Sequence, residues 1–130
     1  MLSALQRVVA MLLCLLPTAL AALGVGGIEI SSGLNQPFDA KIPIIGAKQE
    51  ELVDVKAALA EQDVFDRAGL ARPYSLNVLK FEVVPGDDGS GYIHITSRDG
   101  MREPALEFII EVKWRNGNLQ RKYSVLLEPR

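Results

Sequence analysis

The stretch ALEFIIEVKWRNGNLQRKYSVLL, residues 105–127, carries the clearest structural pattern in the chain. Apolar and charged side chains alternate up to Trp114, and a second alternating run begins at Leu119. A period of two places successive side chains on opposite faces of a β-strand. The pattern therefore predicts two half-buried strands whose inward residues are Leu106, Phe108, Ile110, Val112, Trp114, Leu119, Tyr123, Val125 and Leu127.

Asn116-Gly117 lies between the two strands and predicts a two-residue hairpin turn, because both residues tolerate positive φ. A turn at these two residues also sets the register of the ladder. The expected cross-strand pairs are Trp114 with Leu119, Ile110 with Tyr123, Phe108 with Val125 and, on the outer face, Glu111 with Lys122.

Shorter alternating segments precede this hairpin, at residues 27–30, 38–44, 78–83 and 92–96. In the second of them Phe38, Ala40, Ile42 and Ile44 share one face. Pro43 has no N–H to donate to a ladder, so this strand is expected to lie at a sheet edge or to end there. The cluster at residues 85–91, rich in Gly and Asp, predicts a turn rather than a cation loop, because it lacks the spaced acidic ligands of an EF-hand.

The period changes in the middle of the chain. Over residues 49–61, Leu52, Val55 and Leu59 recur at helical spacing with charges between them, which predicts an amphipathic helix. Its apolar stripe is expected to pack on the core, with a partner-binding face as the alternative. A second short helix is expected to be capped by Asp63 and to end at Gly69.

These elements predict a mainly β fold, an antiparallel two-sheet sandwich with an immunoglobulin-like layout and one helical insertion at about 49–69. The chain lacks the Cys–Trp–Cys core of true immunoglobulin domains, so only the general layout is expected.

The first residues have a different composition. Arg7 precedes the apolar run 8–16, and Ala19-Leu20-Ala21 supplies small residues two positions apart. These are the parts of a secretory signal peptide, so residues 1–21 are expected to be removed, leaving 22–130 as one domain. Cys14, the only cysteine, lies inside the apolar run rather than at the cleavage site, which argues against a lipoprotein.

Composition excludes several function classes. The formal net charge is −2, and no basic cluster stands out, so nucleic acid is not an expected partner. No apolar segment after residue 22 is long enough to span a membrane. His94 is the only histidine, and no recognisable motif surrounds it. A general base needs a nucleophile or an orienting partner within hydrogen-bond reach, so His94 is interpreted as a solvated strand residue. Trp114 with Arg121 is expected to form a cation–π contact. No catalytic residue, cofactor or metal site is predicted.

Several stretches together resemble the N-terminal periplasmic domain of the FimV family, whose members take part in type IV pilus assembly and cell-pole organisation. The stretches are 27–30, 34–42, 67–73, 79–83, 96–98, 102–108 and 111–127, in the family's order and spacing. The resemblance implies structural or partner-contact roles for Leu34, Asn35, Gln36, Pro37, Arg72, Pro73, Glu103, Pro104, Trp114, Gly117 and Tyr123.

The resemblance implies a periplasmic, non-enzymatic scaffold or adaptor linked to pilus assembly, twitching motility or the cell pole. Its partners would be envelope proteins, the pilus secretin among the candidates, close to peptidoglycan. Family members usually continue into a LysM module, a transmembrane helix and a cytoplasmic region, whereas this sequence ends at Arg130; we expect a stand-alone relative or a shortened gene product. A periplasmic module that binds glycan or peptidoglycan is the alternative function, and a small hydrolase is the third.

Overall fold

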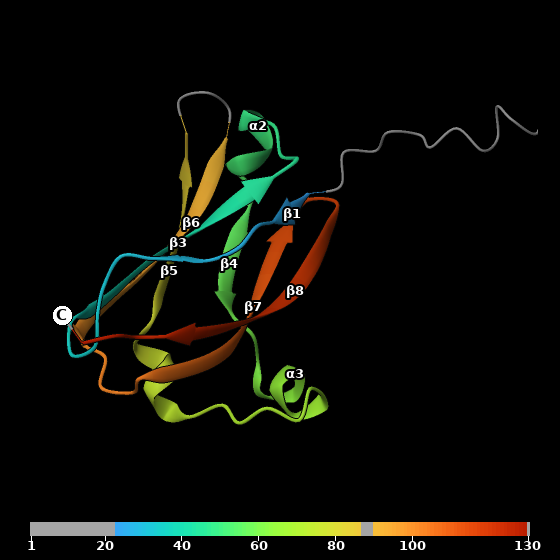
Figure 1. Ribbon diagram of the computed structural model, residues 1–130. Helices are drawn as coiled ribbons and strands as arrows, with labels where there is room; N and C mark the ends of the chain where they lie inside the picture. Colours follow the sequence, from blue (N-terminus) through green and yellow to red (C-terminus); the bar gives the residue numbers. More distant parts are fainter. Residues whose placement is uncertain (1–22, 87–89, 130) are drawn as a thin grey trace, which may run out of the picture.

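Two antiparallel sheets stack face to face in the computed structural model, which describes residues 23–86 and 90–129 (Figure 1). The first sheet has the order β1-β3-β6-β5, with β2 also paired to β3. Its strands are β1 Gly24–Val25, β2 Glu29–Ile30, β3 Pro37–Ile45, β5 Lys80–Pro85 and β6 Gly91–Gly100. The second sheet has the order β4-β7-β8, with β4 Lys56–Leu59, β7 Ala105–Trp114 and β8 Gly117–Leu126. The predicted sandwich is confirmed.

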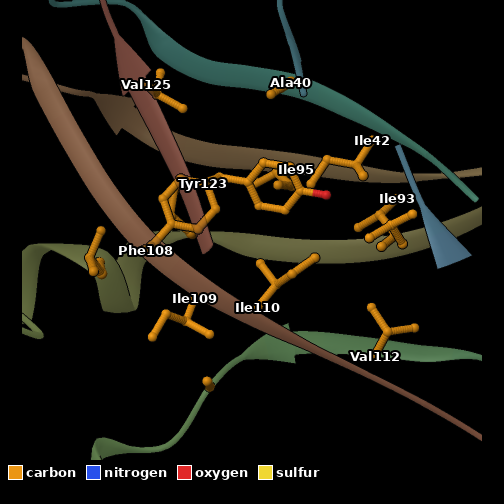
Figure 2. Close-up of a cluster of buried hydrophobic side chains, with 14 of the residues drawn as sticks. Ala40, Ile42, Ile93, Ile95, Phe108, Ile109, Ile110, Val112, Tyr123 and Val125 are labelled. Atoms are coloured by element: carbon orange, nitrogen blue, oxygen red, sulfur yellow. The ribbon is translucent and has the colours of Figure 1, made fainter. Parts of the chain in front are cut away.

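The core fills the space between the two inner faces. Phe38, Ala40, Ile42 and Ile44 of β3 are all buried, as their alternation predicts. Figure 2 shows side chains of the first sheet facing those of β7 and β8; the labelled residues of the two sheets include Ile42, Ile93, Ile95, Phe108, Ile110, Val112 and Tyr123. Burying one such side chain stabilises the fold by about 1.5–3 kcal/mol.

The register of the β7–β8 hairpin differs from the prediction by two residues. Trp114 pairs with Gly117, which places Arg115 and Asn116 at the turn. The predicted pairs Trp114–Leu119, Ile110–Tyr123, Phe108–Val125 and Glu111–Lys122 are therefore wrong; the observed partners are Gly117, Arg121, Tyr123 and Gln120 respectively. Asn116 and Gly117 do not adopt positive φ. Their tolerance of positive φ is the reason for expecting them at the turn, and the turn does not use it. A slip of two residues keeps every side chain on its face, so the predicted faces hold.

The predicted helix at 49–61 is also wrong. Only α2, Gln49–Leu52, is helical, and the following residues form β4 against β7. Val55, Ala57 and Leu59 are spaced by two and are more buried than their neighbours Lys56 and Ala58. The pattern thus fits a strand as well as a helix, and pairing with the second edge of β7 selects the strand, because tertiary context overrides helix propensity.

The second short helix is α3, Gln62–Arg67, followed further on by a 3₁₀ helix at Tyr74–Val78. The residue that precedes its first turn is Glu61, so Asp63 lies inside the helix and is not the predicted cap. Gly69 ends the turn with φ of +68°, as predicted. Helix α3 lies over the outer face of β7, where it helps to bury Ile109, a residue predicted to point outward with the charged side chains.

Pro43 lies inside β3 rather than at a free edge or at the strand's end. The outer neighbour of β3 is discontinuous: β1 pairs with Ile44 and Ile45, and β2 pairs with Ala40 and Lys41. Pro43 lies where this neighbour is interrupted, and its carbonyl accepts a hydrogen bond from the N–H of Gly26 at 2.9 Å. The missing N–H is accommodated by the break between β1 and β2.

Two predictions fall on residues outside the described part of the chain. The leader at 1–21 is one, and the acidic tip of the 85–91 turn, residues 87–89, is the other. The strands flanking that tip pair up to Pro85 and Gly91, as a hairpin requires.

Candidate functional site

His94 lies on the outer face of the first sheet, where its Nε2 is 2.7 Å from Oδ1 of Asp39. The two residues come from the adjacent strands β6 and β3, and His94 stands directly opposite Lys41 on one side and Glu82 on the other. His94 therefore has a hydrogen-bonded partner that the sequence around it does not reveal. Both residues occupy outward positions of alternating strands, so only the strand order was lacking to find the pair.

Aromatic and cationic side chains surround His94 on this face. The ring of Tyr92 meets His94 edge to face with centroids 6.3 Å apart, and the Lys41 ammonium lies 5.0 Å from the Tyr92 centroid. The buried Ser97 hydroxyl accepts from the N–H of Phe38 and donates to the carbonyl of Asp99, both at 2.7 Å, so it is committed to the backbone. His94 lines neither of the two grooves described below.

The segment Leu34-Asn35-Gln36-Pro37 ties three parts of the backbone together at one end of the sandwich. Leu34 N–H donates to Glu128 O at 2.8 Å, and Asn35 N–H donates to Met101 O at 2.7 Å. Asn35 adopts a φ of +66°, a conformation that asparagine tolerates better than most residues. Pro104 belongs to the same end, where its carbonyl accepts from Leu127 N–H at 2.7 Å, and the exposed Glu103 precedes it.

Arg72 fastens the segment between α3 and the 3₁₀ helix. Its Nε donates to the carbonyl of Ala60 and its Nη1 to Oδ1 of Asn77, both at 3.1 Å. The guanidinium also lies 5.7 Å from the ring centroid of the buried Phe65. Pro73 directly precedes the 3₁₀ helix and has the extended conformation of an N-cap residue.

The remaining motif residues lie on the β7–β8 hairpin. Tyr123 is buried and donates its hydroxyl hydrogen to the carbonyl of Gly26 at 2.8 Å, and burial raises the pKa of this phenol above its usual value. Arg121 lies 5.0 Å from the Tyr123 ring and donates to the carbonyl of Val25, so its predicted cation–π contact with Trp114 is replaced by one with Tyr123. A Cβ at Gly117 would lie 3.2 Å from the Trp114 indole, so the residue without one lets the tryptophan pack over the turn.

These motif residues do not converge on one site. They lie at the ends, the turn and the middle segment of the sandwich; the structure places the Leu34–Pro37 and Glu103–Pro104 segments at one end and Trp114 against Gly117 at the β7–β8 turn. Two further grooves contain none of these motif residues in their lining.

A groove of about 470 Å³ lies between β4 and β5, the edge strands of the two sheets. Its apolar lining comprises Leu52, Val53, Val55, Ala57, Phe81 and Val83. Val53 is 83% exposed at this surface. Sequence reasoning missed the groove because it assigned residues 55–59 to a helix, and without β4 there is no second edge.

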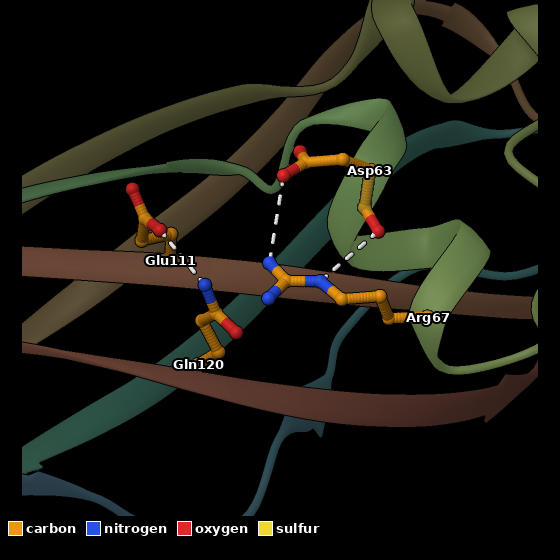
Figure 3. A network of polar contacts seen from close by, with 4 residues as sticks. All are labelled: Asp63, Arg67, Glu111 and Gln120. Carbon is orange, nitrogen blue, oxygen red and sulfur yellow. Dashed lines mark hydrogen bonds and ion pairs between the residues drawn. The ribbon is translucent and has the colours of Figure 1, made fainter.

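A second groove, of about 390 Å³, lies between α3 and β8 on the outer face of the second sheet. Figure 3 shows Arg67 of α3 beside Asp63, above the strands that carry Glu111 and Gln120. Arg67 Nη2 is 3.4 Å from Asp63 Oδ2, and Gln120 Nε2 donates to Glu111 Oε2 at 3.0 Å. The hydrogen bond from Gln120, followed by that from Lys113, lowers the pKa of Glu111.

Within residues 23–86 and 90–129, no three His, Asp or Glu side chains gather closely enough to hold a metal ion. The helices of this described part are all too short or too polar to cross a membrane.

Comparison with known proteins gives a consistent result. Residues 23–130 match the family model described as the FimV N-terminal domain, an Ig-like domain. The chain is 41% identical over 107 residues to the motility hub protein FimV of Pseudomonas aeruginosa strain PAO1, and equally to that of strain UCBPP-PA14. The aligned region covers 82% of this chain but only 12% of each relative. No solved structure matches the chain.

Proposed function

The chain belongs to the family of FimV N-terminal Ig-like domains, and from this premise we propose that it is a non-enzymatic scaffold or adaptor. It binds envelope proteins during type IV pilus assembly, twitching motility or organisation of the cell pole. The name of its relatives, motility hub protein, supports a role in motility that depends on protein partners. Because the chain spans 12% of those relatives, their complete activity stays a proposal for this domain.

The groove between β4 and β5 is the observation that carries the proposal. Two strand edges with open backbone positions flank an apolar surface, and an extended segment of another protein adds to such an edge through main-chain hydrogen bonds. Val53 and Phe81 give the groove apolar contact area, whereas Lys56 and Glu82 give it one charge of each sign. This composition suits a protein segment better than a glycan, which usually stacks on an open aromatic surface.

The periplasm is the proposed compartment. The leader pattern at residues 1–21 supports export, and the family match begins at residue 23, close to the predicted cleavage site after Ala21.

The absence of catalysis is proposed from the surroundings of the single histidine. His94 is hydrogen-bonded to Asp39, and within the described residues no hydrogen bond joins its ring to a hydroxyl that it could activate as a nucleophile.

A photo-crosslinking amino acid at Val53 tests the scaffold proposal in living cells that assemble type IV pili. We expect a specific adduct with an envelope protein, identified by mass spectrometry. The matched control is the same amino acid at Tyr74, which is 86% exposed on the 3₁₀ helix, away from the groove. Identical adducts from both positions, or none from Val53, would contradict the proposal.

A further inference from the structure

Strand β8 presents the longest free edge of the second sheet. It runs for ten residues, Gly117–Leu126, and within the described chain it is hydrogen-bonded in a sheet only to β7. The outer edge of such a strand carries backbone donors and acceptors that another strand can use. Gln120 and Lys122 of this strand line the groove under α3, so side-chain contacts on the outer face of β8 are available beside its main-chain edge.

The second groove has an apolar floor and a cationic rim. Val64, Ala68 and Ile109 supply the floor, and Arg67 and Lys122 bring two cations to the rim. Gln120 and Arg121 complete this lining, which contains no carboxylate. The arrangement favours a ligand that combines an apolar side chain with negative charge.

The counter-ions of these cations are easily exchanged. Arg67 meets Asp63 at 3.4 Å, with both side chains about 70% exposed, and Lys122 meets Glu107 at 3.8 Å, with both about half exposed. Exposed pairs of this kind contribute little, because water screens them. Arg121 does not add to this rim, because its side chain lies on the other face of β8, where it donates to the carbonyl of Val25 and lies 5.0 Å from the Tyr123 ring centroid.

Charge also argues against a second copy of the chain on this edge. Strand β8 contains Arg121 and Lys122 and no acidic residue. Antiparallel pairing of two β8 edges about a central twofold axis would bring Arg121 of each copy opposite Lys122 of the other, and like charges directly opposite each other are destabilising. The occupant should instead be a different segment that carries carboxylates.

From these contacts we infer that the β8 edge binds an extended acidic segment of a partner protein by strand addition. The added strand forms a ladder with β8, places an apolar side chain against Val64 and Ile109, and directs carboxylates to Arg67 and Lys122. This surface is separate from the β4–β5 groove, because it lies at the opposite edge of the second sheet. The inference rests on the proposed scaffold role and adds to it a second binding surface, whose partner segment is acidic.

A synthetic peptide provides the test. The probe is a capped ten-residue peptide of alternating Val and Glu, titrated into the purified chain by isothermal titration calorimetry. Its control is the same peptide with Lys in place of Glu. We expect saturable binding of the acidic peptide only. The β8 amide protons should become protected from hydrogen exchange, as strand addition requires.

Charge reversal locates the site. Arg67→Glu with Lys122→Glu is expected to weaken binding at least about tenfold, because like charges would then face each other. The double variant Arg67→Gln with Lys122→Gln should lose less affinity for the acidic peptide. It replaces the charge-reversal variant in the test if that variant does not fold. Lys80→Glu on β5 and Val53→Lys in the other groove should leave affinity unchanged. Equal binding of both peptides, no binding, or full affinity in the Arg67/Lys122 variants would overturn the inference without touching the β4–β5 proposal.

Discussion

The hydroxyl of Tyr123 on β8 lies 2.8 Å from the carbonyl oxygen of Gly26, a residue 97 positions earlier in the sequence. Together with the hydrogen bond from Arg121 to the carbonyl of Val25, this contact joins the second sheet to the first strand of the first sheet. Removing the Tyr123 hydroxyl in Tyr123→Phe should lower the free energy of unfolding by about 0.5–1.5 kcal/mol. Urea denaturation measures the change. A loss above about 3 kcal/mol would mean that the ring itself has been displaced.

The same tyrosine predicts a pH dependence. Burial raises the pKa of Tyr123 above its ordinary value of 10.0, so the folded state keeps a proton that the unfolded state releases. The resulting stability is fully present below pH 10 and is lost as the pH rises through the folded-state pKa. Tyr123→Phe should flatten the alkaline limb of a stability–pH curve. If the loss of stability at alkaline pH is unchanged in Tyr123→Phe, that loss is caused by the titration of other groups.

Phe108 and Glu111, on opposite faces of β7, test which face of the strand is buried. Phe108 is fully buried, so Phe108→Ala should lower the free energy of unfolding by about 3–5 kcal/mol. Glu111 is held by Lys113 and Gln120 at the surface, so Glu111→Ala should cost less than about 1 kcal/mol. Thermal and urea unfolding of both variants provide the comparison. Equal losses would contradict the assigned faces.

Gly69 tests the end of α3. Its φ of +68° is strained for any residue with a Cβ, although the space around it is open. Gly69→Ala should therefore cost about 1–2 kcal/mol through backbone strain alone. Gly24→Ala is the matched control, since it has open space and no positive φ, and it should change stability little. Similar urea midpoints for the two variants would exclude backbone strain as the cause.

Export makes a prediction about the N-terminus. The Arg7, apolar-run and Ala19-Leu20-Ala21 pattern predicts cleavage after Ala21. Mass spectrometry of protein from periplasmic extract should find Ala22 first, give or take a residue. A dominant form that begins at Met1 in the cytoplasm would contradict both the leader and the compartment.

His94 tests the non-enzymatic proposal. His94→Ala removes the contact with Asp39 at a partly exposed position, so we expect stability to change by less than about 1 kcal/mol. Twitching zones on agar should keep their wild-type diameter. If a normally folded His94→Ala protein abolished motility, the Asp39–His94 pair would become the leading functional candidate.

Alternation along the strands predicted the buried faces because a side chain's face depends only on local geometry. It did not predict the hairpin register, since Phe108 opposite Tyr123 and Phe108 opposite Val125 bury the same side chains. Residues 55–59 satisfied both helical and strand spacing, and only the free edge of β7 decided between them. The Asp39–His94 contact and both grooves depended on which strands are neighbours. That order is a property of the whole chain rather than of any window of sequence.

The hydrogen bonds from Arg121 and Tyr123 to residues 25 and 26 have a consequence for the order of folding. A polypeptide emerges from the ribosome with its N-terminus first, so β1 is present long before the strand that holds it. Before these contacts form, β1 is held by its pairing with Ile44 and Ile45 of β3 and by the hydrogen bond from the Gly26 N–H to the Pro43 carbonyl. Contacts so distant in sequence slow folding, because a large loop must close before they form. The earliest strand to be synthesised is therefore expected to be among the last to become protected from hydrogen exchange.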